Sequence, residues 1–486
     1  MSASALPTSV EYLRFLPEII LSIAATLVMM LEPLTGLSKK TALAALTLVA
    51  FLGAMVAAVF ANGSPGTAFS GLLIVDGFGT LFRVLVIGVG ALTVFTSNAF
   101  LTREGANSGE YYALVLFSVL GQCVMVTAND LIMVFIGLEI SSISSYVLAG
   151  YLRDDKRANE AALKYFLLGS FATAFLLYGI ALIYGATGST NLVNIRASVS
   201  SATAAPSTIL VGIAAALMLV GFGFKVSAAP FQMWAPDVYQ GAPTPVTAFL
   251  SAGPKAAAFA VFLRVFMTSF QPIGESWEPL VWISALLSMT IGNFAALLQT
   301  DVKRMLAYSS IAHAGYILVA ITARSEEGIA AAMFYLAAYV LMNIGAFAVV
   351  AHVSGKGEKF LKIDDLAGLG VRLPMTAAAF SIFLLSLIGV PLTGGFFGKF
   401  YIFKAALESK LIWLAVLGLL NSAVAAYYYL RILVVMYMQE PGEAVLKLGP
   451  LPIGLRAALI APLVGILLLG IFPSALLEFA IRSSKL

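Results

Sequence analysis

The sequence predicts an all-α integral membrane protein with about fourteen transmembrane helices, because its composition is strongly apolar and its apolar residues form long segments. Of the 486 residues, 60% are hydrophobic and 11% are charged, and the mean hydropathy is +0.98. Soluble domains carry about 25% charged residues, and no soluble fold of this length could bury so much apolar surface. Most of the chain must therefore face lipid.

Fourteen apolar segments can be marked along the chain, and most have the roughly 20 residues that a helix needs to cross a bilayer. Segment 373–407 is too long for one straight span, and its "GVPLTGGFFGKF" predicts a break followed by re-entry. No linker divides the chain, so a single polytopic domain is expected over residues 1–486. The segments cover residues 15–37, 41–61, 75–100, 110–128, 130–152, 160–186, 207–229, 243–270, 279–299, 303–323, 327–352, 373–407, 410–438 and 452–480.

Basic residues in the connections between segments predict the orientation. With the N-terminus outside, the odd-numbered connections face the cytoplasm and hold fourteen lysines and arginines, against about three in the even-numbered connections. This bias predicts an even number of spans, with both termini on the periplasmic side. The cytoplasmic set is Lys39, Lys40, Arg103, Arg153, Lys156, Arg157, Lys303, Arg304, Lys356, Lys359, Lys362, Arg372, Lys447 and Arg456, and the outer set is Arg196, Arg324 and Lys410.

Composition also excludes several kinds of site. The net charge of +4 is too small and too scattered to indicate nucleic-acid binding. The single cysteine, Cys123, excludes a disulfide framework and leaves too few thiolates for an iron–sulfur cluster. Two histidines, His313 and His352, cannot alone form a conventional haem or zinc site. No metal or cofactor is therefore expected on this chain.

Five ionisable residues fall well inside predicted spans, on five different segments: Glu139, Lys225, Lys255, His313 and Lys399. Charge at membrane depth is costly and usually marks an ion or proton path. We therefore predict that these residues form a polar line through the membrane interior and carry protons.

Structural explanations compete with this prediction. Glu139 could belong to a buried structural ion pair, and His313 could be a hydrogen-bonded core histidine. Basic side chains near the end of a helix usually extend to the headgroups, and this is expected for Lys164, Arg264 and Lys404.

Prolines near the buried lysines predict broken helices. Pro230 has no amide hydrogen and blocks the helical bond to the carbonyl of Val226, next to Lys225; Pro391 does the same to the carbonyl of Leu387. Unpaired backbone at membrane depth is tolerated only against protein or a water-filled cavity. Such breaks are typical of ion paths in transporters.

The two broken segments, the seventh and the twelfth, lie five segments apart and each carries a lysine. Five is an odd number, so a second copy of a five-helix unit must enter the membrane from the opposite face. We therefore predict two inverted five-helix repeats, at residues 110–270 and 279–438.

Acid–base physics suggests how these groups would act. Burial and a nearby carboxylate have opposite effects on a lysine, so a lysine held between them can gain or lose a proton when its partner moves. Glu139 and Lys225 are the candidates for this pair, and Lys255, His313 and Lys399 could pass a proton along through water. No Ser–His–Asp grouping stands out among the many serines.

At these residues the sequence resembles the N-type antiporter-like membrane subunits of respiratory complex I. The phrase "PDVYQGAPTPV" distinguishes this type from the related L and M types. The resemblance runs from about residue 12 to the last segment. It is carried by "NDLIMVFIGLEISSISSYVLAGYLRDDKRANEAALKYF" at 129–166, "GFGFKVSAAPFQMWAPDVYQGAPTPVTAFLSAGPKAAAF" at 221–259, "DVKRMLAYSSIAHAGYILVA" at 301–320 and "LLSLIGVPLTGGFFGKFYIF" at 384–403.

The resemblance implies roles for individual residues. The glutamate of the fifth helix matches Glu139, the lysines of the broken seventh and twelfth helices match Lys225 and Lys399, and the central lysine of the eighth helix matches Lys255. Relatives often have histidine after "PF" where this chain has Gln232, so a proton role at that position is in doubt.

The resemblance also implies a function. The chain would be a proton-translocating subunit of NADH:quinone oxidoreductase, with one antiporter-like channel driven by quinone reduction elsewhere in the complex. NADH, FMN, iron–sulfur clusters and quinone would be used by other subunits. The expected partners are neighbouring antiporter-like and small membrane subunits, protons and the lipid of a bacterial inner membrane, with no nucleic acid.

Three alternatives remain. The first is a subunit of a multi-subunit cation/proton antiporter, which would share the fold and the lysines, although "PDVYQGAP" argues against it. The second is a related hydrogenase-linked or plastoquinone-linked complex. The third, a structural membrane scaffold, would have no reason to keep five ionisable groups in hydrocarbon.

Overall fold

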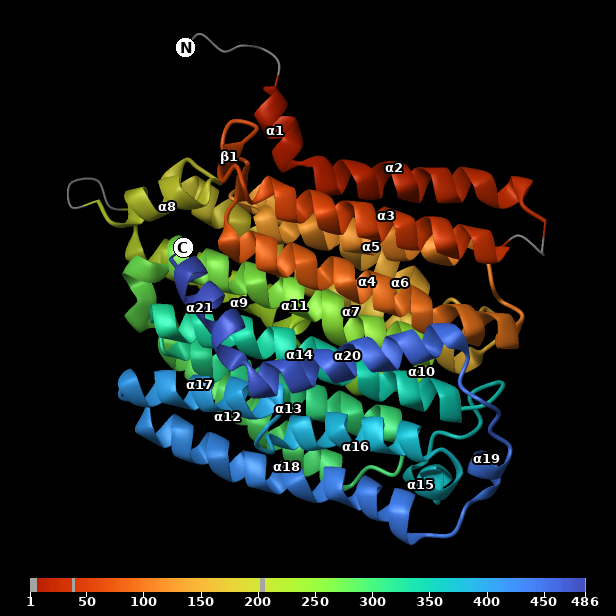
Figure 1. Ribbon diagram of the computed structural model, residues 1–486. Helices are drawn as coiled ribbons and strands as arrows, with labels where there is room; N and C mark the ends of the chain where they lie inside the picture. Colours follow the sequence, from red (N-terminus) through yellow and green to blue (C-terminus); the bar gives the residue numbers. More distant parts are fainter. Residues whose placement is uncertain (1–6, 37–39, 202–205, 486) are drawn as a thin grey trace.

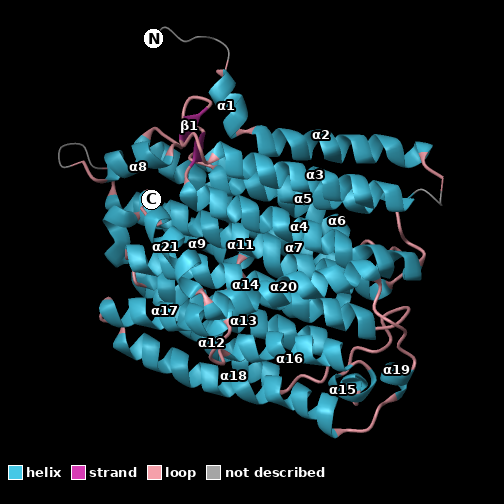
Figure 2. Ribbon diagram, viewed as in Figure 1, coloured by secondary structure: helices cyan, strands magenta, loops and turns pink. Residues whose placement is uncertain are grey.

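The structure is a computed structural model that describes residues 7–36, 40–201 and 206–485. Most of the described chain is helical, and the long helices lie side by side in one bundle (Figures 1 and 2). A small antiparallel hairpin of β1 (Gly66–Ala68) and β2 (Leu73–Val75) lies at one end of the bundle. The prediction of an all-α membrane fold is confirmed.

Thirteen helices of the described residues are long and apolar enough to cross a membrane. The predicted twelfth segment is the remaining crossing, and it is broken into α16 (Pro374–Ile388) and α17 (Gly394–Glu408). The predicted number of segments is thereby confirmed. The thirteen helices are α2 (Leu16–Leu31), α3 (Lys40–Ala61), α4 (Gly77–Glu104), α5 (Gly109–Thr127), α6 (Leu131–Ala149), α7 (Lys156–Thr187), α9 (Thr208–Lys225), α11 (Thr244–Thr268), α12 (Gly274–Leu297), α13 (Val302–Thr322), α14 (Glu326–Val353), α18 (Ile412–Met438) and α20 (Ile453–Ile471).

Short helices occupy the ends and the connections. The predicted segment 452–480 is two helices, because the chain turns at Phe472 and Pro473 begins the second one. The short helices are α1 (Ser9–Arg14), α8 (Leu192–Val199), α10 (Trp234–Gly241), α15 (Leu369–Arg372), α19 (Glu443–Leu446) and α21 (Pro473–Ser483), with 3-10 turns at Glu32–Leu34, Gln271–Ile273 and Ile363–Leu366.

The two predicted breaks are present. The helix α9 ends at Lys225, and irregular residues 226–233 lead to α10. The α16–α17 break spans residues 389–393, and Gly389 adopts φ +96°, a conformation that glycine takes without strain. Helix α11, by contrast, continues through Pro254.

The helices α11, α13 and α14 form the centre of the bundle. In each of them 94% of the membrane-spanning window is buried, whereas the figure is 33% for α2 and α20 and 39% for α7 and α18. The outer helices expose large apolar side chains such as Phe171, Trp413 and Leu420. Buried polar groups on the central helices are thus shielded from lipid.

The described ends of the chain lie at the same end of the bundle, beside β1 and α8, while α15 and α19 lie at the opposite end (Figure 1). This arrangement agrees with an even number of crossings. Lys39, one of the basic residues used to predict orientation, lies outside the described residues. The repeat boundaries at 110–270 and 279–438 stay a prediction.

Candidate functional site

Lys225 is the last residue of α9 and turns its ammonium toward α6. Its Nζ donates to Ser142 Oγ at 2.6 Å and to Tyr146 OH at 3.4 Å. The rings of Tyr146 and Tyr165 lie 5.3 and 5.7 Å from this nitrogen. Hydroxyls, aromatic faces and the negative end of its own helix therefore stabilise the cation.

Glu139 lies on α6 one turn before Ser142, on the same face of the helix. Among the described residues it forms no ion pair within 4.0 Å, and its Oε1 is buried without a hydrogen-bond partner. The predicted partnership with Lys225 is thus not a direct contact in this structure, because Ser142 accepts the hydrogen bond instead. The lysine thus donates to Ser142 and Tyr146 of α6, while Glu139 of the same helix does not accept from it.

A small cavity joins Lys225 to the central helix α11. Its volume is about 10 Å³, which is room for about one water. It is lined by Met125, Leu138, Ser141, Ser142, Ser145, Tyr165, Lys225, Pro254 and Ala258.

Side chains of α5 extend this polar region. Ser118 Oγ lies 3.1 Å from Ser141 Oγ and 3.2 Å from Ser145 Oγ, and it accepts from Gln122 Nε2 at 3.2 Å. The other amide atom, Gln122 Oε1, is buried without a partner and faces Gly253 of α11. A serine–glutamine cluster on α5 and α6 thus extends from the cavity beside Lys225 to Gly253 of α11.

Lys255 lies in the middle of α11 and is 2% exposed. Its Nζ donates to the backbone oxygen of Ser310 at 2.8 Å and to Ser310 Oγ at 2.5 Å. Tyr339 OH donates to the same Oγ at 2.8 Å. The ammonium is therefore held by one serine of α13, and the ring of the α14 tyrosine that donates to this serine lies 5.8 Å from the nitrogen.

His313 follows Ser310 by one turn of α13 and is 1% exposed. Both ring nitrogens are occupied: Nδ1 lies 2.5 Å from Tyr335 OH and Nε2 lies 3.1 Å from Tyr429 OH. Two tyrosine hydroxyls satisfy the ring, as expected of a core histidine. Its place between two lysines is also the one that a proton path requires.

Lys399 lies on α17 and points at the broken end of α16. Its Nζ donates to the backbone oxygens of Leu387 at 3.0 Å and Ile388 at 2.9 Å, and to Ser422 Oγ at 2.7 Å. The last carbonyls of a helix lack internal partners and carry partial negative charge. Because Pro391 cannot donate to Leu387, the break leaves these oxygens free to bind the lysine.

The five predicted residues lie on α6, α9, α11, α13 and α17. Lys255, His313 and Lys399 are buried, whereas Glu139 and Lys225 are partly exposed. The ring of Tyr316 connects His313 and Lys399: it lies 5.6 Å from the His313 ring and 4.7 Å from Lys399 Nζ. The serines, Gln122 and the tyrosines were not predicted. The run "EISSISSY" at 139–146 was the available signal, because it places several hydroxyls on one membrane helix.

The basic residues near helix ends behave in two ways. Lys164 pairs with Glu160 and Asp237 with 41% of its side chain exposed, and Lys404 pairs with Glu408 with 58% exposed. The expectation for Arg264 is wrong. Its side chain is 5% exposed, because Asp76 supplies a counter-charge through two hydrogen bonds of 2.8 and 2.9 Å.

The chain is similar to several proteins of known family or structure. Residues 128–425 match the family described as NADH:quinone oxidoreductase/Mrp antiporter, TM. The chain is 67% identical over 474 residues to NADH-quinone oxidoreductase subunit N 1 of Solibacter usitatus, covering 98% of this chain and 97% of that protein. A chain of respiratory complex I from Thermus thermophilus, solved with bound aureothin, superimposes with a TM-score of 0.82 at 36% identity, over 96% of this chain and 99% of that chain.

A protein outside the NADH-quinone oxidoreductases also shares the fold. A chain of the Mrp complex from Dietzia sp. DQ12-45-1b superimposes with a TM-score of 0.86 at 21% identity, over 98% of this chain and 97% of that chain. At this identity the likeness shows the fold alone. The identity with the N subunits is much higher and extends over nearly the whole length, so the chain belongs to the NADH:quinone oxidoreductase/Mrp antiporter family and, within it, to the NADH-quinone oxidoreductase N subunits.

Proposed function

We propose that the chain is a proton-translocating subunit of a bacterial NADH:quinone oxidoreductase and carries one antiporter-like proton channel. The observation that carries this proposal is the placement of Lys225 and Lys399 at the two helix breaks, with Lys255 and His313 buried between them. A membrane protein keeps such groups in its interior when protons or ions must cross.

The geometry suggests how the channel operates. Lys225 can bind Ser142, as in this structure, or swing along the same face of α6 toward Glu139. A change of charge near Glu139 would shift Lys225 between these acceptors and alter how tightly the amine holds its proton. The released proton would pass along the serine–glutamine cluster to Lys255, and then past His313 toward Lys399.

The rest of the enzyme would lie in other subunits. The names of the relatives support an assembly that oxidises NADH and reduces quinone, with FMN and iron–sulfur clusters outside this chain. The neighbours would be further antiporter-like and small membrane subunits. The expected setting is the bacterial inner membrane with both chain ends in the periplasm, and the two five-helix repeats would be inverted halves of the channel.

The proposal is tested by Lys225→Ala in the assembled complex, reconstituted into proteoliposomes. Proton flux through this channel should fall strongly, because the substitution removes a proton carrier from the path, and fewer protons should be pumped per NADH oxidised. Lys164→Ala is the matched control, since Lys164 is half-exposed and paired near a helix end. An assembled Lys225→Ala complex that pumps normally would refute the assigned role.

Assembly is tested separately. The tagged chain is extracted in a mild detergent, its co-purifying proteins are identified by mass spectrometry, and the same fraction is assayed for NADH:quinone reductase activity. Flavin and iron–sulfur subunits together with activity are expected. Small membrane partners without redox subunits would favour a cation/proton antiporter instead.

A further inference from the structure

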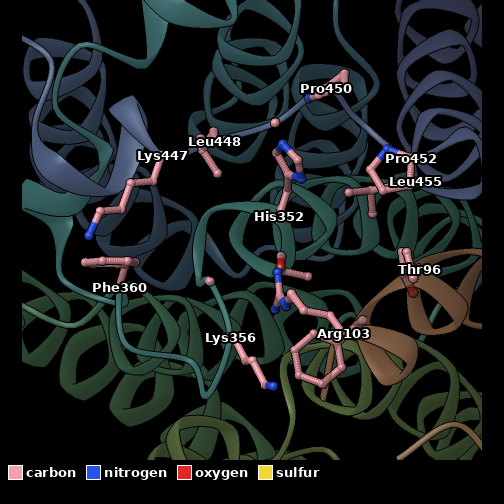
Figure 3. A pocket seen from close by; sticks show the side chains of 15 residues that line it. Thr96, Arg103, His352, Lys356, Phe360, Lys447, Leu448, Pro450, Pro452 and Leu455 are labelled. Carbon is pink, nitrogen blue, oxygen red and sulfur yellow. The ribbon is translucent and has the colours of Figure 1, made fainter. Parts of the chain in front are cut away.

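A cationic pocket lies away from the proton path, where α4, α14 and the connection to α20 meet (Figure 3). Its volume is about 460 Å³. Arg103, Lys356 and Lys447 line it together with His352, and its lining contains no aspartate or glutamate among the described residues. A concave site of this kind favours an anion.

Figure 3 shows the Arg103 guanidinium below His352 in the middle of the view, with the Lys447 and Lys356 ammonium groups further out, on the left and at the bottom. The guanidinium of Arg103 is held from behind by the backbone oxygen of Ala351 at 3.3 Å and by Ser354 Oγ at 3.2 Å. Lys356 is exposed and has no ion pair among the described residues. His352 Nε2 is buried without a hydrogen-bond partner.

Two of the cations have carboxylate neighbours outside the pocket. Glu104 lies 3.2 Å from Arg103 Nε, and Glu443 lies 2.5 Å from Lys447 Nζ on the exposed surface. Neither carboxylate lines the pocket. Arg103 uses one N–H of each of its three nitrogens in these contacts, which leaves two N–H groups on its terminal nitrogens. Lys356 has no ion pair among the described residues, so the pocket keeps a net positive charge.

An apolar groove continues from this pocket. It has a volume of about 320 Å³, runs between α3, α4 and the start of α20, and shares Ala99 and Pro452 with the pocket. Leu48, Val94 and Phe95 line its length. The charged pocket is therefore adjacent to a largely apolar groove between membrane-spanning helices.

We propose that the pocket and groove together bind one anionic phospholipid. The phosphate would lie against Arg103, Lys356 and Lys447, and an acyl chain would lie in the groove along Val94 and Phe95. Basic pockets between membrane helices on the cytoplasmic side suit anionic headgroups, and this pocket lies at the end of the bundle that carries most of the basic connections. A free phosphate would use the pocket alone and would leave the groove unexplained.

The bound lipid would join elements that are distant in the sequence. The groove lies where α3, α4 and the start of α20 meet, and the connection that precedes α20 lines the pocket. This site goes beyond the proposed proton path, since none of its residues belongs to the line from Glu139 to Lys399. The result of the lipid-binding test therefore does not depend on proton pumping.

The test is photo-crosslinking of the purified, delipidated complex with a phosphatidylglycerol that carries a diazirine on one acyl chain. Cross-links are expected on α3 and α4 around Leu48 and Phe95, located by mass spectrometry. Excess unlabelled phosphatidylglycerol should remove them, whereas phosphatidylcholine and millimolar inorganic phosphate should not. The combined change of Arg103, Lys356 and Lys447 to alanine should reduce labelling by about fivefold or more.

A second triple variant controls for charge. Arg153, Lys156 and Lys359 are exposed and lie at the same end of the bundle outside the pocket, and their change to alanine should leave labelling intact. Ala99→Phe, which fills the junction of pocket and groove without changing charge, should also abolish labelling.

Four results would overturn the proposal: equal labelling in the pocket and control variants, equal labelling by phosphatidylcholine, competition by inorganic phosphate, or protection of the groove by another subunit of the intact complex.

Discussion

The buried lysines share one chemical environment. Lys225, Lys255 and Lys399 each donate to serine hydroxyls, and two of them also donate to backbone oxygens. None forms an ion pair within 4.0 Å among the described residues. A permanent carboxylate partner would hold the ammonium charged, whereas neutral acceptors stabilise the cation without preventing loss of the proton. Such lysines are suited to carry a mobile proton.

Ser142 provides a test of this view, because it accepts the 2.6 Å hydrogen bond from Lys225. Ser142→Ala removes a hydrogen bond to a charged group, worth about 1.5–3 kcal/mol, and should bias Lys225 toward Glu139. We expect proton flux through this channel to fall by about tenfold, seen as fewer protons pumped per NADH oxidised in proteoliposomes, while the complex still assembles.

The matched control is Ser144→Ala on the same helix. Its hydroxyl donates to the backbone oxygen of Ile140 and does not contact Lys225. Both variants remove one buried hydroxyl from α6, so a general effect on the helix would lower pumping equally. If the two variants pump equally, whether at the wild-type level or at a reduced level, the Ser142 contact has no role in the path.

The ionisable residues of the site could be predicted from the sequence, because a charge within a long apolar segment is conspicuous. The hydroxyl and amide groups between them could not. Serine and tyrosine are common in membrane helices, and only tertiary packing shows that Ser118, Ser141 and Ser145 of two helices face one another. Arg264 was misinterpreted for the same reason, since its partner Asp76 lies 188 residues away in the sequence.

At the scale of the elements, proline and glycine made the breaks predictable. Pro230 and Pro391 mark the ends of α9 and α16 within a few residues. The β1–β2 hairpin was not predicted, because its strands have three residues each and follow no clear alternation. The turn at Phe472 was also missed, since the apolar run continues across it.

Asp76 and Arg264 join the start of α4 to the last turns of α11, and this link should depend on pH. Burial alone would raise the pKa of Asp76, but the Arg264 guanidinium outweighs it and holds that pKa below its ordinary value. A carboxylate with a lowered pKa stabilises the folded state above its unfolded pKa, and this stabilisation is lost as the pH falls below about 4. We expect the thermal midpoint of the purified complex to drop in that range.

Asp76→Asn isolates this contribution. It leaves the buried Arg264 without a counter-charge and should cost about 2 kcal/mol at neutral pH, less than for a fully buried pair because the Asp76 side chain is 27% exposed. The thermal midpoint of this variant should also fall less than that of the wild type below about pH 4, because asparagine does not titrate. Asp154→Asn, at an exposed position without an ion pair among the described residues, is the control. Identical pH profiles for wild type and Asp76→Asn would show that the pair does not link the two helices energetically.

For the whole molecule, charge and packing divide the bundle into two ends. One end carries the described chain termini, the β1–β2 hairpin and α8 (Figure 1). The opposite end carries most of the basic connections and a buried link in which Glu358 receives hydrogen bonds from Lys303 at 3.2 Å and from the backbone of Thr244 at 2.8 Å. Because basic connections remain in the cytoplasm, the end with α15 and α19 should face inward.

This orientation can be measured by labelling single cysteines with a membrane-impermeant maleimide. In a Cys123→Ala background, Ser276→Cys places a thiol at an exposed position in the first turn of α12, near the 3-10 turn 271–273, and Lys359→Cys places one in the connection 354–368. Spheroplasts should label Ser276→Cys directly and Lys359→Cys only after permeabilisation. Cys123 is the single native cysteine, so its replacement leaves the introduced thiol as the only one on the chain. The reverse pattern would place the termini in the cytoplasm. Every connection of the chain would then lie on the opposite side of the membrane from the side that its basic residues predict.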